Sequence, residues 1–259
     1  MPYAGPDGYN AMSILDTEQL TGRTRTHVLE FSESGFTLQP SVARAFLALR
    51  AAAARDGLDL APASSFRDFE RQLAIWNDKF LGRRALLDRE GGALDPAAMS
   101  EGEIVHAILQ WSALPGASRH HWGTEIDVYD RHALRSGQRM KLVPAEFAPA
   151  GVFAPLERWL AAHAEDYGFF RPYDQDRGGV RPEPWHLSFA PLSGPALQAL
   201  TPQVLAEALN GAALAGEAVV RSQLEQIHAR YVSAVASPGP RTLRASALPA
   251  DSSPAARPS

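Results

Sequence analysis

The chain of 259 residues contains no cysteine. Disulfide bonds, thiolate catalysis and cysteine-based zinc sites are therefore excluded, and a metal ion must be bound by histidine, carboxylate or water. The chain also lacks a basic excess, because its formal net charge is -4, so we expect no nucleic-acid partner. Long hydrophobic runs are absent as well, and we expect no membrane-spanning segment.

The N-terminus lacks the pattern of a secretory leader. Residues 1–20 carry Asp7, Asp16 and Glu18 and contain no apolar run. By sequence alone the protein would be cytoplasmic, although its compartment and its oligomeric state stay open.

The composition that remains is typical of a globular protein, with 45% hydrophobic and 21% charged residues. A chain of this length can bury a large core, and we expect one catalytic domain at residues 41–200 after an N-terminal extension, 1–40. Closing helices are expected to pack on this domain within 201–236. Residues 237–259 are rich in proline, serine and alanine and predict a disordered tail.

Apolar spacing predicts the secondary structure. Helices are predicted at 41–55, 68–81, 101–114, 153–167, 202–209 and 216–231, and strands at 58–61, 126–129 and 185–189. Residues 82–100 mix arginine, glycine and aspartate and predict an irregular insertion.

The densest chemical motif surrounds His120 and also contains His121, Glu125 and Asp127. His120 and Asp127 are seven positions apart, so an unbroken strand would point their side chains to opposite faces. A bend at Gly123 would let both face one ion.

A second motif, Glu183-Pro184-Trp185-His186, supplies what the first lacks. A catalytic zinc site takes three protein ligands and leaves a fourth position to water. His186 provides the third ligand. Glu183, three residues earlier, is a carboxylate placed to take a proton from metal-bound water and pass it to the leaving amine.

Neighbouring residues leave alternatives open. Adjacent side chains diverge, so we expect only one of His120 and His121 to reach the metal. Glu125 lies two residues before Asp127 and would share its face in an extended chain, which makes it a reserve candidate for metal ligand or base. The isolated histidines are expected to be structural or surface residues: His27, His106, His132, His163 and His228.

Arg67 follows a predicted strand and precedes a predicted helix. Its planar guanidinium could bind a carboxylate or a developing oxyanion through two parallel hydrogen bonds. The competing interpretation, favoured by position alone, is a surface salt bridge with Asp68 or Glu70.

The two motifs in this order resemble the signature of the D-alanyl-D-alanine metallopeptidases. The signature is read in Ser118-x-His120-x-x-Gly123-x-x-x-Asp127 followed by Glu183-x-x-His186. The proline after Glu183 is similar to VanY-type D,D-carboxypeptidases more than to VanX-type dipeptidases. Ser65-Phe66-Arg67 with Gln72 also resembles a Ser-x-Arg and Gln element of the family.

This resemblance implies a role for each matching residue. His120, Asp127 and His186 would bind one zinc ion, Glu183 would be the catalytic base, and Arg67 would contact substrate in the active site. Substrate-binding roles are implied for Ser118, Gln72, Ser65 and Trp185. The match covers about Ser41 to Phe189. The family fold is α+β, with a small antiparallel sheet that carries the zinc site and helices packed around it.

The function that follows is zinc-dependent removal of a C-terminal D-alanine from peptidoglycan stem peptides. Related alternatives are an L,D-carboxypeptidase, a D-Ala-D-Ala dipeptidase and a wall-lytic endopeptidase, and a zinc-containing binding module is the alternative outside enzymes. Two features depart from the family. A small residue commonly stands where this chain has Glu125, and no export signal is visible although the family's substrate lies in the cell wall.

Overall fold

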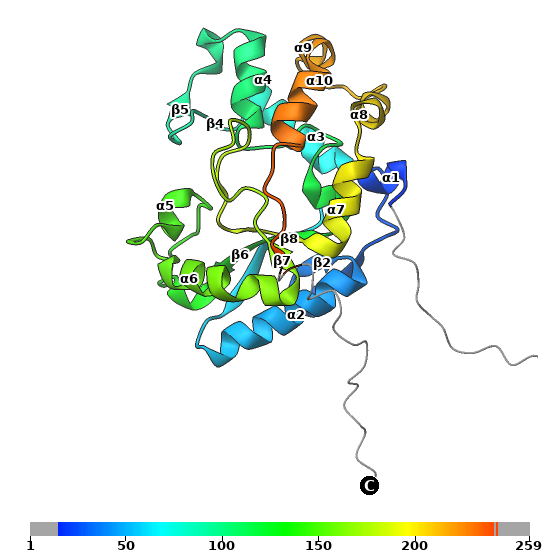
Figure 1. Cartoon of the computed structure of the whole chain (residues 1–259). Coiled ribbons are helices and arrows are strands. Elements are labelled where there is room, and N and C mark those ends of the chain that lie inside the picture. The colour runs from blue at the N-terminus through cyan, green and yellow to red at the C-terminus, as the bar shows by residue number, and fades with distance from the viewer. Residues whose placement is uncertain (1–14, 241, 243–259) are drawn as a thin grey trace, which may run out of the picture.

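A four-stranded antiparallel sheet lies at the centre of the computed structural model, which describes residues 15–240 and 242 (Figure 1). Its strands, in spatial order, are β3 (Leu60–Ser64), β6 (Glu125–Asp130), β8 (His186–Phe189) and β7 (Phe169–Phe170). The predicted strands at 126–129 and 185–189 are therefore confirmed, and the predicted strand at 58–61 lies slightly further along the chain. Together with the surrounding helices this is the expected α+β fold.

The two faces of the sheet differ in chemistry because successive side chains of a strand point to opposite sides. Ile126 and Leu187 are fully buried in an apolar core that helices α2 (Pro40–Arg55) and α6 (Ala154–His163) cover. In Figure 1 these two helices lie together below the sheet. Asp127 and His186, which alternate with those apolar residues, point to the opposite face.

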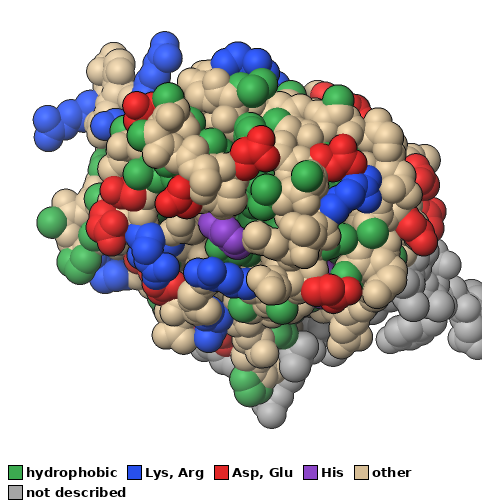
Figure 2. Space-filling model, turned by 90° about the horizontal axis from the view of Figure 1, so that it is seen from above, with side chains coloured by type: hydrophobic (Ala, Val, Ile, Leu, Met, Phe, Trp, Pro, Cys, Tyr) green, Lys and Arg blue, Asp and Glu red, His purple; other side chains and the backbone are tan. Residues whose placement is uncertain are grey.

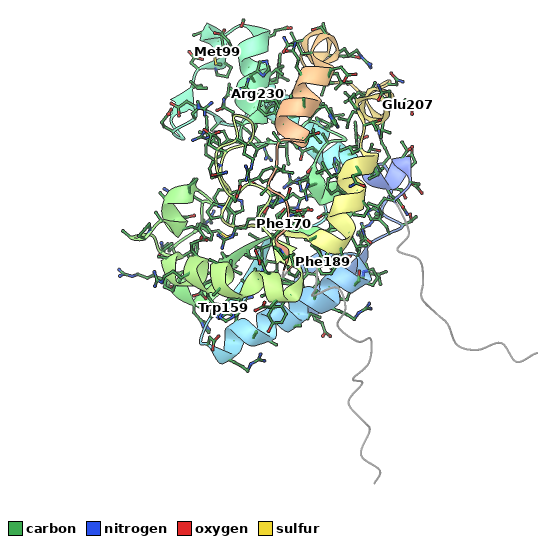
Figure 3. All side chains as sticks on the ribbon, viewed as in Figure 1. Met99, Trp159, Phe170, Phe189, Glu207 and Arg230 are labelled. Carbon is green, nitrogen blue, oxygen red and sulfur yellow. The ribbon has the colours of Figure 1, made fainter. Side chains whose placement is uncertain are left out.

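Helices α2 and α6 form where apolar residues recur at helical spacing. In α2, Pro40 occupies the first turn, where its missing N–H costs nothing, and Phe46, Leu49 and Ala53 are fully buried. Trp159 of α6 (Figure 3) donates its indole N–H to Asp56, the residue that follows α2, at 2.7 Å. The sheet and these two helices therefore form two layers packed against each other.

A second apolar core lies beyond the polar face of the sheet. It joins α3 (Phe69–Phe80), α4 (Glu101–Leu109), α7 (Ala190–Ala199), α8 (Pro202–Ala208), α9 (Glu217–Ser222) and α10 (Leu224–Ile227). Trp76 of α3 is fully buried there and donates to the backbone oxygen of Ala215 at 3.0 Å. The C-terminal helices are thus built into the core that carries α3.

Smaller elements complete the described chain. They are α1 (Thr17–Leu20), the hairpin β1 (Leu29–Phe31) and β2 (Phe36–Leu38), the hairpin β4 (Leu86–Leu87) and β5 (Ala93–Leu94), and α5 (Pro144–Phe147). Short 3-10 turns occur at 32–34, 96–98, 119–122, 131–133 and 164–167. In the part of the chain that the structure describes, no helix is both long and apolar enough to cross a membrane.

Several predicted boundaries are wrong. The helix predicted at 101–114 ends at Leu109, and the helix predicted at 216–231 is broken at Gln223 and closes with a π-helical turn at 228–232. The first hairpin and α7 were not predicted, and the insertion at 82–100 contains the second hairpin.

The chain beyond Ser237 also differs from a free tail where it is described. The backbone N–H of Ala236, just before the predicted tail, donates to the carbonyl of Pro172 at 2.8 Å, and Thr242, within the predicted tail, is fully buried. Packing therefore continues past the predicted start of the tail. The rest of the predicted tail, 243–259, lies outside the described residues.

Candidate functional site

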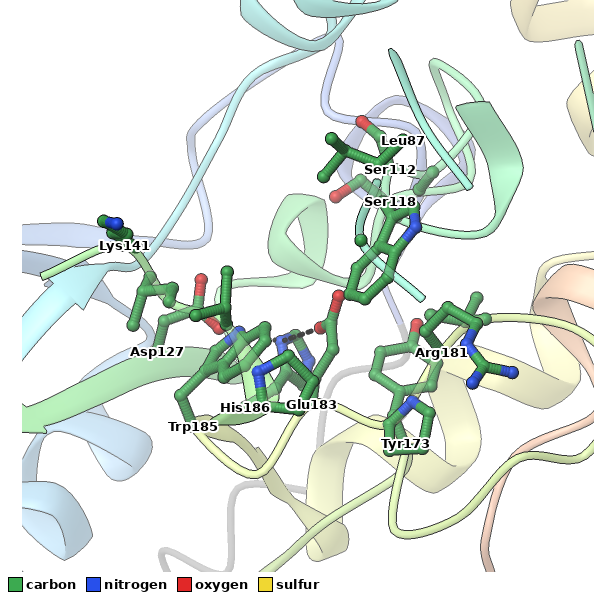
Figure 4. A pocket seen from close by; sticks show the side chains of 18 of the residues that line it. Leu87, Ser112, Ser118, Asp127, Lys141, Tyr173, Arg181, Glu183, Trp185 and His186 are labelled. Atoms are coloured by element: carbon green, nitrogen blue, oxygen red, sulfur yellow. Dashed lines mark hydrogen bonds and ion pairs between the residues drawn. The ribbon is translucent and has the colours of Figure 1, made fainter. Parts of the chain in front are cut away.

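Three side chains converge on the polar face of the sheet. Asp127 of β6 and His186 of β8 are paired in register, and His120 comes from the 3-10 turn Arg119–Trp122. One ligand atom of each lies within 4.8 Å of the other two, and all three residues are buried. Figure 4 shows Asp127, His186 and Glu183 among the side chains that line a pocket. The structure therefore brings together the three residues predicted to bind metal.

Gly123 makes this convergence possible. It ends the turn that carries His120 and has a left-handed backbone with a φ of 65°. A Cβ at this position would lie 2.3 Å from Cγ1 of Val28, so any side chain would have to displace Val28 and hold a strained backbone. The predicted bend at Gly123 is confirmed, and strand alternation does not apply because His120 precedes the strand.

The carboxylate of Asp127 lies between the two imidazoles. Its Oδ1 is 2.9 Å from Nδ1 of His186, and its Oδ2 is 3.3 Å from Nε2 of His120. Burial favours the neutral acid, but both histidines outweigh it and hold the pKa of Asp127 well below its ordinary value. Burial also lowers the pKa of His120, which favours the neutral imidazole that a metal requires. Two imidazoles and a carboxylate are a donor set that fits zinc.

Glu183 lies next to the triad and lines the same pocket. Its Oε2 is 3.6 Å from Nδ1 of His186. Burial, with a smaller effect of the Asp127 charge, raises the pKa of Glu183 to about 7. A carboxylate with such a pKa can accept and release a proton near neutral pH, as a general base must.

Arg67 reaches the pocket from the loop before α3. Its guanidinium donates to Oε1 of Gln72 at 2.7 Å and to Oγ of Ser64 at 3.3 Å. The competing salt-bridge interpretation is wrong, because Asp68 caps α3 and Glu70 pairs with Arg23.

His121 points away from the triad. Its Nδ1 lies 2.6 Å from the carbonyl oxygen of Arg67, and its Nε2 accepts the backbone N–H of Gly116 at 3.2 Å. Both ring nitrogens are therefore used in packing the loops around the site, and burial lowers the pKa of His121 to about 3.

Glu125 lies behind His186 rather than in the pocket. It is fully buried, does not line the pocket, and is not one of the three converging ligands. Burial opposes its ionisation, but Arg119 and His186 outweigh this and lower the pKa of Glu125 to about 2. The reserve prediction of Glu125 as ligand or base is wrong.

The four predicted substrate-binding residues divide into two pairs. Ser118 and Trp185 line the pocket. Ser65 does not, and its hydroxyl instead accepts the backbone N–H of Thr37 at 2.9 Å. Gln72 is fully buried, and it orients Arg67 without reaching the pocket.

Many residues that line the pocket were not predicted, among them Lys79, Arg119 and Tyr173. Lys79 follows Gln72 by seven residues, which places both on one face of α3 and was a readable signal. Burial lowers the pKa of Lys79 to about 8. The ring of Tyr173 lies 5.1 Å from that of His186, centre to centre, and only the fold brings them together.

The pocket itself has a volume of about 790 Å³. Viewed from above, Figure 2 shows a histidine side chain in a hollow of the surface with lysine or arginine side chains close by. The pocket is large enough for several residues of a peptide, and its basic lining favours an acidic ligand.

Comparisons with known proteins agree with this chemistry. A family model described as VanY, D-alanyl-D-alanine carboxypeptidase, matches residues 35–192. An uncharacterized protein of Haemophilus influenzae is 38% identical over 121 residues, which cover 46% of this chain and 92% of that protein. A D-alanyl-D-alanine carboxypeptidase of Enterococcus faecalis is 28% identical over 141 residues, which cover 53% of this chain and 42% of that enzyme.

Solved structures with some likeness include two peptidases. VanYB in complex with D-alanine-D-alanine has a TM-score of 0.47 at 21% identity, covering 71% of this chain and 88% of that one. The LdcB LD-carboxypeptidase has a TM-score of 0.43 at 21% identity, and the match covers 71% of this chain and 69% of that one. Because the family model spans more than half of the chain, the protein belongs to the VanY family of D-alanyl-D-alanine carboxypeptidases.

Proposed function

We propose that this protein is a zinc-dependent D,D-carboxypeptidase that removes the terminal D-alanine from peptidoglycan stem peptides. The observation that carries the proposal is the convergence of His120, Asp127 and His186 beside Glu183 in a pocket. Membership of the peptidase family supports hydrolysis of a peptide bond.

His120, Asp127 and His186 would hold the ion through their three converging donor atoms. When bound, zinc supplies a Lewis acid for the scissile carbonyl and lowers the pKa of the attacking water to roughly 7. All three side chains are buried, so packing around them restricts their orientation.

Glu183 would act as the base. Its carboxylate takes a proton from the attacking water and delivers it to the nitrogen of the departing D-alanine. Burial raises the pKa of Glu183 in the metal-free protein to about 7, and a raised pKa favours return of the proton to the leaving nitrogen. Retention of such a base also argues against a purely zinc-binding module.

Two cations favour a substrate with a free carboxylate end. Arg67 is held in place by Gln72 and Ser64, so its guanidinium is oriented before substrate arrives. Lys79 also lines the pocket and forms no salt bridge within the described part of the chain. We assign Lys79 to the terminal carboxylate and Arg67 to the developing oxyanion. An endopeptidase would not need the first of these charges.

The test is product analysis on a stem pentapeptide that ends in D-Ala-D-Ala. Free D-alanine and a tetrapeptide are the expected products, and Glu183→Gln should form both far more slowly. A matched peptide with an amidated C-terminus should be cleaved poorly. The proposal would be contradicted by release of the D-Ala-D-Ala dipeptide or by internal fragments alone. It would also be contradicted if the protein cleaved a tetrapeptide substrate but not the pentapeptide.

A further inference from the structure

Glu125 is a carboxylate that the proposed mechanism leaves unused. It is the first residue of β6, fully buried, and lies opposite Ser188 in the register with β8. Asp127 and His186 form the pair two residues further along β6. The two pairs lie on the same face of the sheet, so Glu125 and His186 are diagonal neighbours.

The imidazole of His186 lies between two carboxylates. Its Nδ1 is 2.9 Å from Oδ1 of Asp127 and 3.6 Å from Oε2 of Glu183, so this nitrogen faces the predicted ligand and base. Its Nε2 is 2.9 Å from Oε2 of Glu125, on the other side of the ring. Each ring nitrogen therefore lies within hydrogen-bond distance of one carboxylate oxygen.

The second oxygen of Glu125 is anchored independently. Its Oε1 accepts hydrogen bonds from Oγ1 of Thr124 at 2.9 Å, from Oγ of Ser188 at 2.9 Å and from Nη2 of Arg119 at 3.3 Å. Arg119 is buried as well, and its positive charge balances the carboxylate where water has no access. One oxygen is thus fixed and the other is directed at His186.

A histidine that binds a metal through one nitrogen must carry its proton on the other. Hydrogen bonds to that N–H orient the ring and set its tautomer. We propose that Glu125 is a positioning residue of the metal site, which accepts the Nε2–H of His186 and so leaves Nδ1 free to bind the ion. This inference rests on the zinc site of the proposed function.

The first test compares zinc affinity, by competition with a chelator, between the wild type and Glu125→Gln. The amide must turn its NH₂ group toward either Arg119 or Nε2 of His186, and both arrangements disturb the site. A decrease in affinity of about 10–100-fold is expected. Thr124→Val is the matched control, because it removes one hydrogen bond to Oε1 of Glu125 and leaves Oε2 untouched. Its zinc affinity should stay within roughly threefold of the wild-type affinity.

Unfolding of the metal-free proteins separates positioning from folding. Equal zinc affinity in Glu125→Gln and the wild type would overturn the inference. It would also be overturned if Glu125→Gln and Thr124→Val lost the same zinc affinity and the same melting temperature.

The second test needs no variant. In the ¹⁵N-labelled, zinc-loaded wild-type protein, a long-range ¹H–¹⁵N correlation spectrum should show a proton on Nε2 of His186. The ¹⁵N chemical shift of Nδ1 should be that of a metal-bound nitrogen. A proton on Nδ1 would overturn the inference even if Glu125→Gln fails to fold. If the wild type binds no zinc, the proposed function falls together with this inference. If it binds zinc and releases D-alanine while its tautomer is reversed, only this inference falls.

Discussion

Glu183 is the side chain whose surroundings most directly decide what the site can do. Its base form must be present for activity, and its pKa rises from 4.5 to about 7 in the metal-free protein. A bound cation would lower that value again. We therefore predict that kcat/KM falls with decreasing pH, with an acid limb between 4.5 and about 7.

Activity should fall as the pH falls, because a protonated Glu183 cannot accept a proton from water. A pH profile measured at saturating zinc checks this prediction. Activity that rises as the pH falls through this window would contradict the role of Glu183 as base.

Lys79 is the residue proposed to bind the terminal carboxylate of the substrate. Replacement by methionine keeps the length of the side chain and removes the charge proposed to bind the terminal carboxylate. Charged hydrogen bonds contribute about 1.5–3 kcal/mol, so KM should rise roughly 10–100-fold with a smaller change in kcat. The amidated peptide is the control, and its cleavage should be insensitive to Lys79→Met. Equal effects on both peptides would remove Lys79 from carboxylate binding.

The contacts of single residues also show where sequence information ends. Glu183 and His186 could be assigned because three residues separate them within one motif. Glu125 and His186 are 61 positions apart, and their contact depends on the register of β6 and β8, which no local pattern encodes. Glu125 was therefore placed on the correct face but given the wrong role.

The 3-10 turn that carries His120 is the element on which the site's geometry depends most. Gly123→Ala would force a left-handed alanine and place its Cβ against Val28. Gly57→Ala is a matched control, since Gly57 is also left-handed but has nothing within 4 Å of an added Cβ. We predict a cost of about 1 kcal/mol in unfolding free energy for Gly57→Ala and a larger cost for Gly123→Ala.

Zinc affinity distinguishes the two glycines further. Only Gly123→Ala should weaken it, because only that turn positions His120. Denaturant unfolding and chelator competition measure the two quantities. Equal stability losses with unchanged zinc affinity would show that the turn does not control the site.

Elements with strong periodicity were predictable and short ones were not. Apolar spacing was enough for α2 and α3, whose predicted ends differ from the observed ends by a residue or so. Strands of two or three residues, such as β1 and β7, carry too few side chains for an alternating pattern. The break at Gln223 has no glycine or proline to signal it, and tertiary packing decides it.

The whole molecule is held together by two cores on opposite sides of the sheet. The sequence predicts a disordered tail, so we expect deletion of residues 243–259 to leave both melting temperature and activity unchanged. Deletion from Ser237 onward should lower the melting temperature, since it also removes Thr242. Identical melting temperatures for the two truncations would contradict the packing of this segment.

The most direct test of the account is metal analysis coupled to a D-alanine release assay on three proteins. The wild type should hold one zinc per chain and release D-alanine from a stem pentapeptide. His186→Ala should lose both properties, and Glu183→Gln should keep the zinc but lose about 10²–10⁴-fold in rate. Release of D-alanine by zinc-free protein, or unchanged release by Glu183→Gln with zinc bound, would contradict the account.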